Sequence, residues 1–110
     1  MNNSPILALL GFAAKAGKLS YGTHATEFSI TSGKAQLVCA AEDISAKSVK
    51  ELKFKAEKQN IPVIILNGIK TEELSKRIGK SCGILGVNDQ GFKDSIMKKY
   101  KEEQRYDGEI

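Results

Sequence analysis

Three short apolar runs alternate with longer segments of helical periodicity, and this alternation constrains the fold more than any other feature. The runs cover residues 35–41, 62–66 and 83–87. Continuous stretches of this length, rich in Val, Ile and Leu, indicate strands buried on both faces. A short edge strand is expected at 18–21. Since the helices and strands alternate with short connections, the sequence predicts an α/β fold with helices on both faces of a mixed, mostly parallel sheet.

Five helices are expected beside these strands, because each has a recognisable start or stop. The first follows Ser4 and Pro5, ends near Gly17 and is apolar nearly all round, so it is buried or docks on a partner. The second runs from Gly22 to Ser32 and has weak helix propensity, so its stability must come from packing. The expected N-caps of the last three helices are Ser45, Thr71 and Asp89.

The length of 110 residues allows one domain with a real core. We expect residues 1–100 to form it and residues 101–110 to be an acidic, frayed and flexible tail. The tail holds two basic and four acidic residues of a chain whose net charge is +4, so residues 1–100 carry +6. A basic body of this kind favours partners rich in phosphate, although many proteins with ordinary solvated surfaces are equally basic.

Metal, membrane and catalytic functions have little support in the sequence. Cys39 and Cys82 lie far apart, and the single histidine has no partner ligand nearby, so we expect no metal and no cofactor. No apolar run reaches the roughly 20 residues of a membrane span, and no secretory signal is present, so a cytoplasmic protein is expected. Residues 11–20 imitate a phosphate loop, but Leu19 stands where a Ser or Thr is needed. His24 with Cys39 or Ser20 does not make a catalytic set, and we expect no enzyme.

The candidate binding site is the start of the second helix, at Gly22, Thr23 and His24. A helix N-terminus presents free backbone N–H groups to an anion. Phosphates would contact these groups, and His24 could read a base edge or a 2′-hydroxyl, although a polar residue in a first helical turn is an equally good interpretation. Four lysines would supply the positive field: Lys15, Lys18, Lys34 and Lys80.

Three further residues have two open interpretations each. Asp43 is expected to cap the turn that follows it, or else to accept from a base or position a lysine. Phe28 and Phe54 are more often core residues than exposed surfaces for base stacking, though both fit poorly on the apolar stripes of their helices.

The order and spacing of several motifs resemble a ribosomal protein superfamily of the L7Ae and L30e type, whose members bind kink-turn RNA. These motifs are the glycines that frame 22–33, Lys34-Ala35 before a strand that ends in Ala41-Glu42-Asp43, Ile61-Pro62-Val63, and 78–83 before the last strand. The segments 9–13 and 88–92 further resemble the bacterial YlxQ-type branch. The resemblance covers nearly all of residues 6–100 and implies a three-layer α/β/α sandwich without catalysis.

In that superfamily the RNA lies against the N-terminus of the second helix and the loop before the last strand. The resemblance therefore implies contacts from 22–28 and from the loop that holds Lys80, Ser81 and Cys82. Gly22 and Thr23 agree with the family pattern. His24 and Ala25 stand where a base-reading pair is usual, and Phe28 stands where a lysine is usual.

These observations favour an RNA-binding accessory protein of translation or ribosome assembly, whose expected partners are RNA, with ribosomal RNA as one candidate, and ribosomal or translation-associated proteins. Sequence selectivity should be modest, and neither a membrane nor DNA is an expected partner. The alternative is a module of the same fold that has lost RNA recognition and uses its first helix or Phe54 to dimerise or dock.

Overall fold

The computed structural model describes residues 4–108, which form five helices and four strands. In chain order these are α1 (Pro5–Lys15), β1 (Leu19–Tyr21), α2 (Gly22–Thr31), β2 (Leu37–Ala41), α3 (Ala46–Glu57), β3 (Val63–Leu66), α4 (Thr71–Ile78), β4 (Ile84–Val87) and α5 (Gln90–Gly108). The expected alternation of helices and strands is confirmed.

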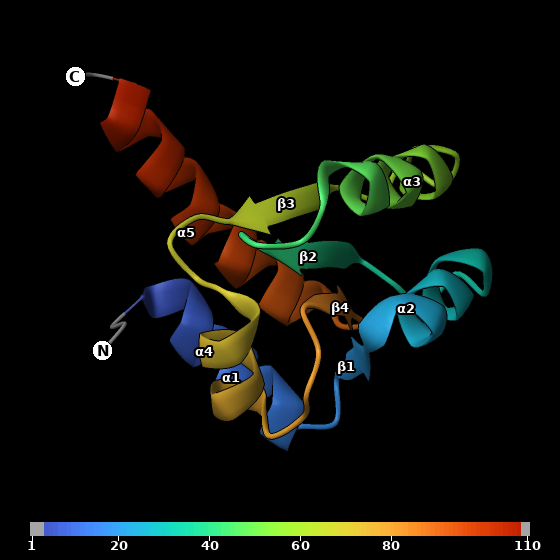
Figure 1. Cartoon of the computed structure of the whole chain (residues 1–110), viewed down its shortest axis with the longest axis horizontal. Helices are drawn as coiled ribbons and strands as arrows, with labels where there is room; N and C mark the ends of the chain where they lie inside the picture. Colours follow the sequence, from blue (N-terminus) through green and yellow to red (C-terminus); the bar gives the residue numbers. More distant parts are fainter. Residues whose placement is uncertain (1–3, 109–110) are drawn as a thin grey trace.

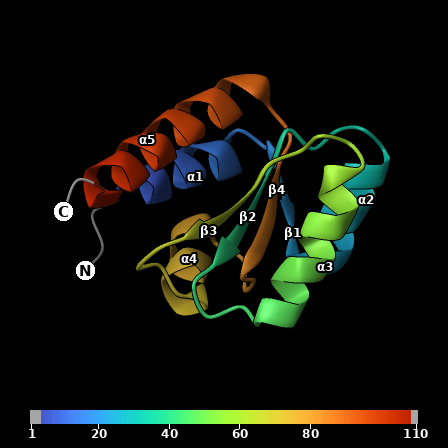
Figure 2. The ribbon, with the colours of Figure 1, turned by 90° about the horizontal axis from the view of Figure 1, so that it is seen from above.

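The helices cover both faces of one sheet (Figure 1). Seen from above, α1, α4 and α5 form one outer layer, and α2 and α3 form the other (Figure 2). The three-layer α/β/α arrangement implied by the resemblance is therefore present.

The sheet has the strand order β1-β4-β2-β3. Its β2 and β3 are parallel, whereas β4 is antiparallel to both of its neighbours. The sheet is mixed as expected. The prediction that it is mostly parallel is wrong, because the β1–β4 and β2–β4 pairs are antiparallel. The direction of β4 is invisible in the sequence, because a strand buried on both faces is apolar throughout whichever way it runs. At one end of the strands, β1 and β2 finish and β4 begins. We call this the α2 end of the sheet, since α2 starts there.

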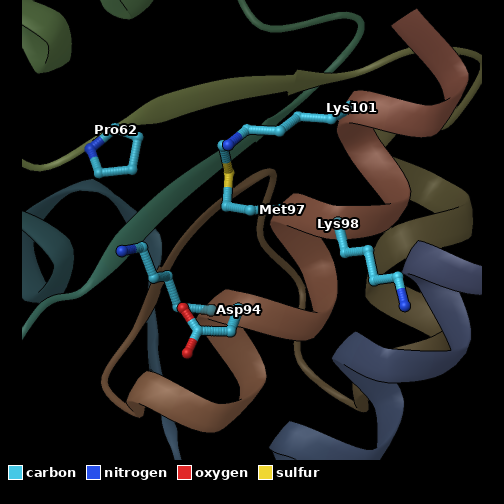
Figure 3. A pocket seen from close by; sticks show the side chains of 6 residues that line it. Pro62, Asp94, Met97, Lys98 and Lys101 are labelled. Atoms are coloured by element: carbon cyan, nitrogen blue, oxygen red, sulfur yellow. The ribbon is translucent and has the colours of Figure 1, made fainter. Parts of the chain in front are cut away.

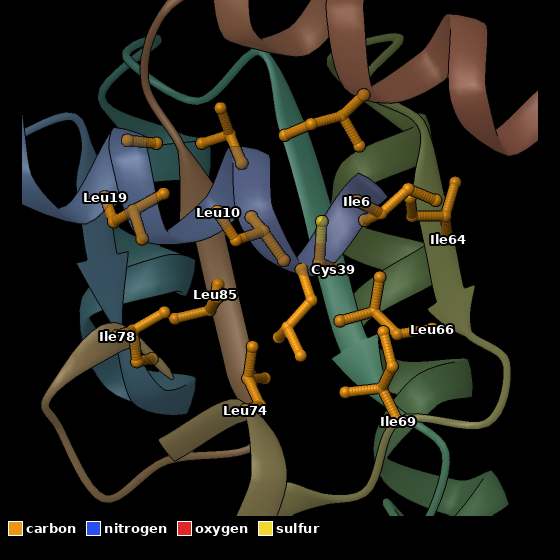
Figure 4. Packing of buried hydrophobic residues seen from close by; sticks show 14 of the residues in the cluster. Ile6, Leu10, Leu19, Cys39, Ile64, Leu66, Ile69, Leu74, Ile78 and Leu85 are labelled. Atoms are coloured by element: carbon orange, nitrogen blue, oxygen red, sulfur yellow. The ribbon is translucent and has the colours of Figure 1, made fainter. Parts of the chain in front are cut away.

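The core has two parts, one on each face of the sheet. The larger part packs α1 and α4 on the sheet through Ile6, Leu10 and Leu74 (Figure 4). Ile96 of α5 belongs to the same cluster. The smaller part packs α2 and α3 on the opposite face through side chains that include Ile30 and Leu52. Helix α1 buries one side on this core, and its Phe12 is exposed on the other side.

Most helix starts are capped by the expected residues, with one exception. The hydroxyl of Ser4 accepts from the N–H of Ile6, and that of Ser45 accepts from the N–H of Ser48. Asp89 accepts from the N–H of Phe92. At the start of α4, Thr71 does not act as the cap: its N–H and its hydroxyl both donate to Asp43 Oδ1, at 2.9 and 2.7 Å.

This contact decides the role of Asp43. The residue acts as a cap, but for α4, which is distant in sequence, and not for the turn that follows it. A carboxylate that accepts two hydrogen bonds at a helix N-terminus satisfies an orphan N–H and opposes the positive end of the helix dipole.

The last helix is longer than expected. Helix α5 continues through Gly108, beyond the expected end near residue 100, and residues 109 and 110 lie outside the described part of the chain. Between residues 4 and 108, none of the helices combines the length and apolarity that a bilayer span requires.

Candidate nucleic-acid interface

Strand β1 leads directly into α2, and Gly22 makes this junction possible. Its φ is +86°, in the region that favours glycine. The N-cap residue Tyr21 makes no side-chain hydrogen bond to the helix. Among the described helices, α2 alone lacks an oxygen side chain over its first N–H groups. The Gly22 N–H is hydrogen-bonded to Cys82, and the N–H groups of Thr23 and His24 face the surface available to a ligand.

The loop before β4 lies beside this helix start. Gly79 ends α4 with a φ of +79°, and the loop then turns toward Tyr21. The Ser75 hydroxyl fixes the loop, because it donates to the carbonyl of Cys82 and accepts from its N–H, both at 3.1 Å. The ammonium of Lys80 lies 5.4 Å from the centre of the Tyr21 ring. One positive charge is thus held near the uncapped N-terminus of α2.

Cys82 contributes a neutral, partly buried group to this site. Burial raises the pKa of its thiol, although hydrogen bonds with the backbone of Gly22 and Ile84 and the charge of Lys80 oppose this rise. Burial, with a smaller effect of Cys82, also raises the pKa of Tyr21. Both groups are therefore protonated near pH 7, and neither adds negative charge where a phosphate would bind. Ser81 is exposed in the same loop.

The outer face of α2 is a shallow groove with exposed apolar surface. The groove has a volume of about 670 Å³ and is lined by Tyr21, His24, Ala25, Glu27, Phe28, Thr31 and Lys55. Phe28 is 67% exposed, so the interpretation as a core residue is wrong. The carboxylate of Glu27 forms an ion pair with Lys55 of α3. This pairing leaves the groove without a free negative charge.

Phe54 also lies at the surface, 62% exposed, and the ammonium of Lys58 lies 4.5 Å from the centre of its ring. The core interpretation is wrong here too. Phe54 does not line the α2 groove.

Asp43 lies at the α2 end of the sheet, but Thr71 occupies its carboxylate. The hydrogen bond from the Thr71 hydroxyl is the largest cause that lowers the pKa of Asp43, followed by the bond from the Thr71 N–H. The structure therefore favours a capping role over contact with a base.

Two of the four expected phosphate-binding lysines, Lys18 and Lys34, lie away from this site. Lys15 ends α1, and the carbonyl of Lys18 accepts from the N–H of Asn88, which follows β4. Lys34 follows the C-terminus of α2, next to Ala35, and Gln36 donates to Val87 at the end of β4. These contacts place Lys18 and Lys34 toward the sheet end opposite Gly22. For these two lysines, the expectation that they share one site with Lys80 is wrong.

Two residues that the sequence did not single out belong to the surroundings of α2. Tyr21 lies under Lys80 and lines the α2 groove. The side chain of Asn88 donates to the Ser20 hydroxyl at 2.9 Å and accepts from the Ser29 hydroxyl, so it joins β1, β4 and α2. Tyr21 could have been found in the sequence, because it is an aromatic residue directly before Gly22. No local signal indicates Asn88, because its partners are distant in sequence.

The described residues bring together neither the candidate catalytic pair nor a group that could hold a metal ion. Cys39 is fully buried in β2, and burial raises the pKa of its thiol to about 12. His24 is exposed on the outer face of α2, so the two are not brought together. Within residues 4–108 no group of three or more His, Cys, Asp or Glu side chains could hold a metal ion.

Comparison with known proteins decides the family. The family model described as "Ribosomal protein L7Ae/L30e/S12e/Gadd45 family" matches residues 5–97. The chain belongs to this family. An Enterococcus faecium protein named "RNA-binding protein YlxQ" is 34% identical over 101 residues, which cover 92% of each chain. The resemblance to the L7Ae-type family and to its YlxQ-like branch is therefore confirmed.

Two solved structures share this fold. A Bacillus halodurans protein of unknown function superposes with a TM-score of 0.82 at 28% identity, over 88% of this chain and 97% of that one. The Giardia lamblia 15.5kD RNA binding protein superposes with a TM-score of 0.73 over 87% of this chain and 82% of that one. Because its identity is only 16%, the second match speaks for the fold alone.

Proposed function

We propose that this member of the L7Ae/L30e/S12e/Gadd45 family is a non-catalytic RNA-binding accessory protein of translation or ribosome assembly. It acts in the cytoplasm, and its RNA is structured, with a ribosomal or other translation-linked RNA as the target. The observation that carries the proposal is the uncapped N-terminus of α2 beside the Lys80 loop. The name of the Enterococcus faecium relative supports RNA as the ligand.

Each part of the site has a distinct role in this proposal. The N–H of Thr23, beside the open backbone of Gly22, and the ammonium of Lys80 contact phosphates, which positions the RNA without reading its sequence. His24 is exposed beside them and reads a base edge or a 2′-hydroxyl. The exposed ring of Phe28 offers a surface on which an unpaired base can stack. Ala25 is exposed and its side chain is small, so the RNA can approach the helix closely at this position.

The proposal is tested by the affinity of the protein for an RNA hairpin with an internal loop and for a DNA duplex of equal length. We expect preference for the RNA. Lys80→Gln should weaken RNA binding about threefold to fivefold and make the slope of log affinity against log salt shallower by about 0.9, the share of one phosphate contact. His24→Ala should mainly flatten discrimination between RNA sequences.

Lys53→Gln is the matched control, because Lys53 is an exposed lysine of α3 outside the site. It removes the same charge and should change the affinity less than twofold. Equal losses for the Lys80 and Lys53 variants, with both folded, would contradict the proposed site.

A protein-interaction module is the second candidate, and one observation favours it. Three phenylalanines are exposed by 60% or more: Phe12, Phe28 and Phe54. Exposed apolar side chains of this size suit a protein interface. A concentration-dependent dimer in sedimentation that Phe54→Ser abolishes, together with no RNA binding, would favour this candidate over the first.

A further inference from the structure

A second groove lies on the other side of the molecule, between α5 and the start of β3. It has a volume of about 490 Å³ and is lined by Pro62, Lys93, Asp94, Met97, Lys98 and Lys101. We call it the α5 groove. Pro62 lies across from Met97 and Lys101 (Figure 3). Neither the proposed function nor the family resemblance uses these residues.

The α5 groove is separate from the site at α2. Strands β1 and β3 are the two opposite edges of the sheet. Three strand spacings of ~4.8 Å put these edges about 14 Å apart. Helix α5 also belongs to the layer that does not contain α2 (Figure 2). One segment of RNA bound at Gly22 would therefore leave the α5 groove free.

The wall formed by α5 alternates positive charge with apolar surface. Lys93, Met97 and Lys101 follow one another at intervals of four residues, so they share one face of the helix. The two lysines are eight residues apart, which is about 12 Å along a helix. Neither has an ion-pair partner among the described side chains. Asp94, the acid of the groove, accepts from the side chain of Gln90 at 3.0 Å.

A smaller polar hollow continues the groove. It has a volume of about 200 Å³ and shares Lys93 with the α5 groove. Its lining includes three amide side chains, those of Gln36, Gln59 and Asn60. Asn60 has a φ of +58° and lies in the turn that follows α3. Amide side chains offer donors and acceptors together, which suits the edges of nucleobases.

We propose that the α5 groove and its polar continuation bind single-stranded RNA as a second nucleic-acid site. Lys93 and Lys101 contact successive parts of the phosphate backbone, and a base lies on the apolar surface of Met97 and Pro62. A duplex would fit less well, because its bases are stacked inside and cannot reach this surface. The protein would then hold a structured RNA segment at α2 and an unpaired segment at the opposite edge of its sheet.

The test uses a fluorescently labelled oligouridylate of ten nucleotides, measured by anisotropy at several salt concentrations. The double variant Lys93→Gln/Lys101→Gln should bind it about tenfold more weakly. The salt slope should become shallower by about 1.4, because each phosphate contact of a single strand contributes about 0.7. The matched control is Lys50→Gln/Lys53→Gln, which removes two exposed lysines from α3 on the other face. It should change the affinity less than twofold.

Three results would overturn the inference: no binding of the oligouridylate by the wild-type protein, equal losses in the two double variants while both are folded, or displacement of the oligouridylate by a ten-residue polyglutamate as effectively as by unlabelled RNA. The last result would assign the groove to an acidic peptide. Lys80→Gln separates the two proposals, since it should weaken the hairpin RNA and leave the oligouridylate unaffected. If the hairpin RNA does not bind at α2, the oligouridylate measurement still tests the α5 groove.

Discussion

Replacing Gly22 by Asn or by Asp separates the charge at the start of α2 from every other property of the site. The two side chains have nearly the same shape, and both tolerate positive φ better than other residues do. No atom lies within 4 Å of a Cβ added at Gly22, so neither variant meets a steric clash. With a φ of +86°, each should lose about 1 to 2 kcal/mol of folding free energy relative to glycine.

Compared with the Asn variant, the Asp variant should be more stable but should bind RNA more weakly. A carboxylate in the first turn of a helix stabilises it by about 0.3 to 1 kcal/mol, so the Asp variant should melt at a higher temperature than the Asn variant. A phosphate about 5 Å away repels the same carboxylate by roughly 0.8 kcal/mol in water and about 3 kcal/mol at an effective dielectric constant of 20. The α2 start is open to solvent, so a penalty near 1.4 kcal/mol, or about tenfold in affinity, is expected.

The assay is a hairpin-RNA titration of both variants beside their melting curves. The gap in affinity should narrow as salt rises, because the Debye length falls from ~10 Å at 0.1 M to ~3 Å at 1 M. Equal affinities of the Asn and Asp variants at low salt, with both folded, would refute a phosphate at this position.

Two more predictions concern single side chains. Cys39, fully buried with a pKa of about 12, should be alkylated far more slowly than the partly exposed Cys82 in the native protein, measured by mass spectrometry of each peptide; equal rates would contradict the position of β2. Asp43→Ala should lower the melting temperature at pH 7, because Thr71 loses its acceptor. The folded-state pKa of Asp43 is lowered, so its stabilisation is present above the unfolded pKa of about 3.9 and fades as pH falls through the folded value. A difference between wild type and variant that does not shrink as pH falls below the unfolded pKa would count against this account.

The sequence predicted the helices and strands because their signals are local. Apolar runs, a proline or hydroxyl at a helix start and a glycine at its end are all read within a few residues. The direction of β4 has no such signal, since a strand buried on both faces is apolar in either direction. The end of α5 was also missed, because its charged last turns look the same as a solvated tail.

The candidate site was predicted in part for the same reason. The helix start at Gly22 was found from its glycine, and the Lys80 loop from the family resemblance. Lys18 and Lys34 were grouped with them in error, because the charge of a residue does not say toward which end of the sheet it lies. The bond between Asp43 and Thr71 joins residues 28 positions apart, so only the tertiary structure could show it.

A titration of the isotopically labelled protein with the hairpin RNA, followed by ¹H–¹⁵N NMR, tests the central proposal most directly. Binding at α2 predicts that the largest shifts fall on the amides of Gly22, Thr23 and His24 and on the loop 80–83. Lys50 and Lys53, exposed on α3 outside both proposed sites, should change little. Shifts that are largest at these two lysines, or that leave Gly22 and the loop unchanged, would contradict the proposed RNA site.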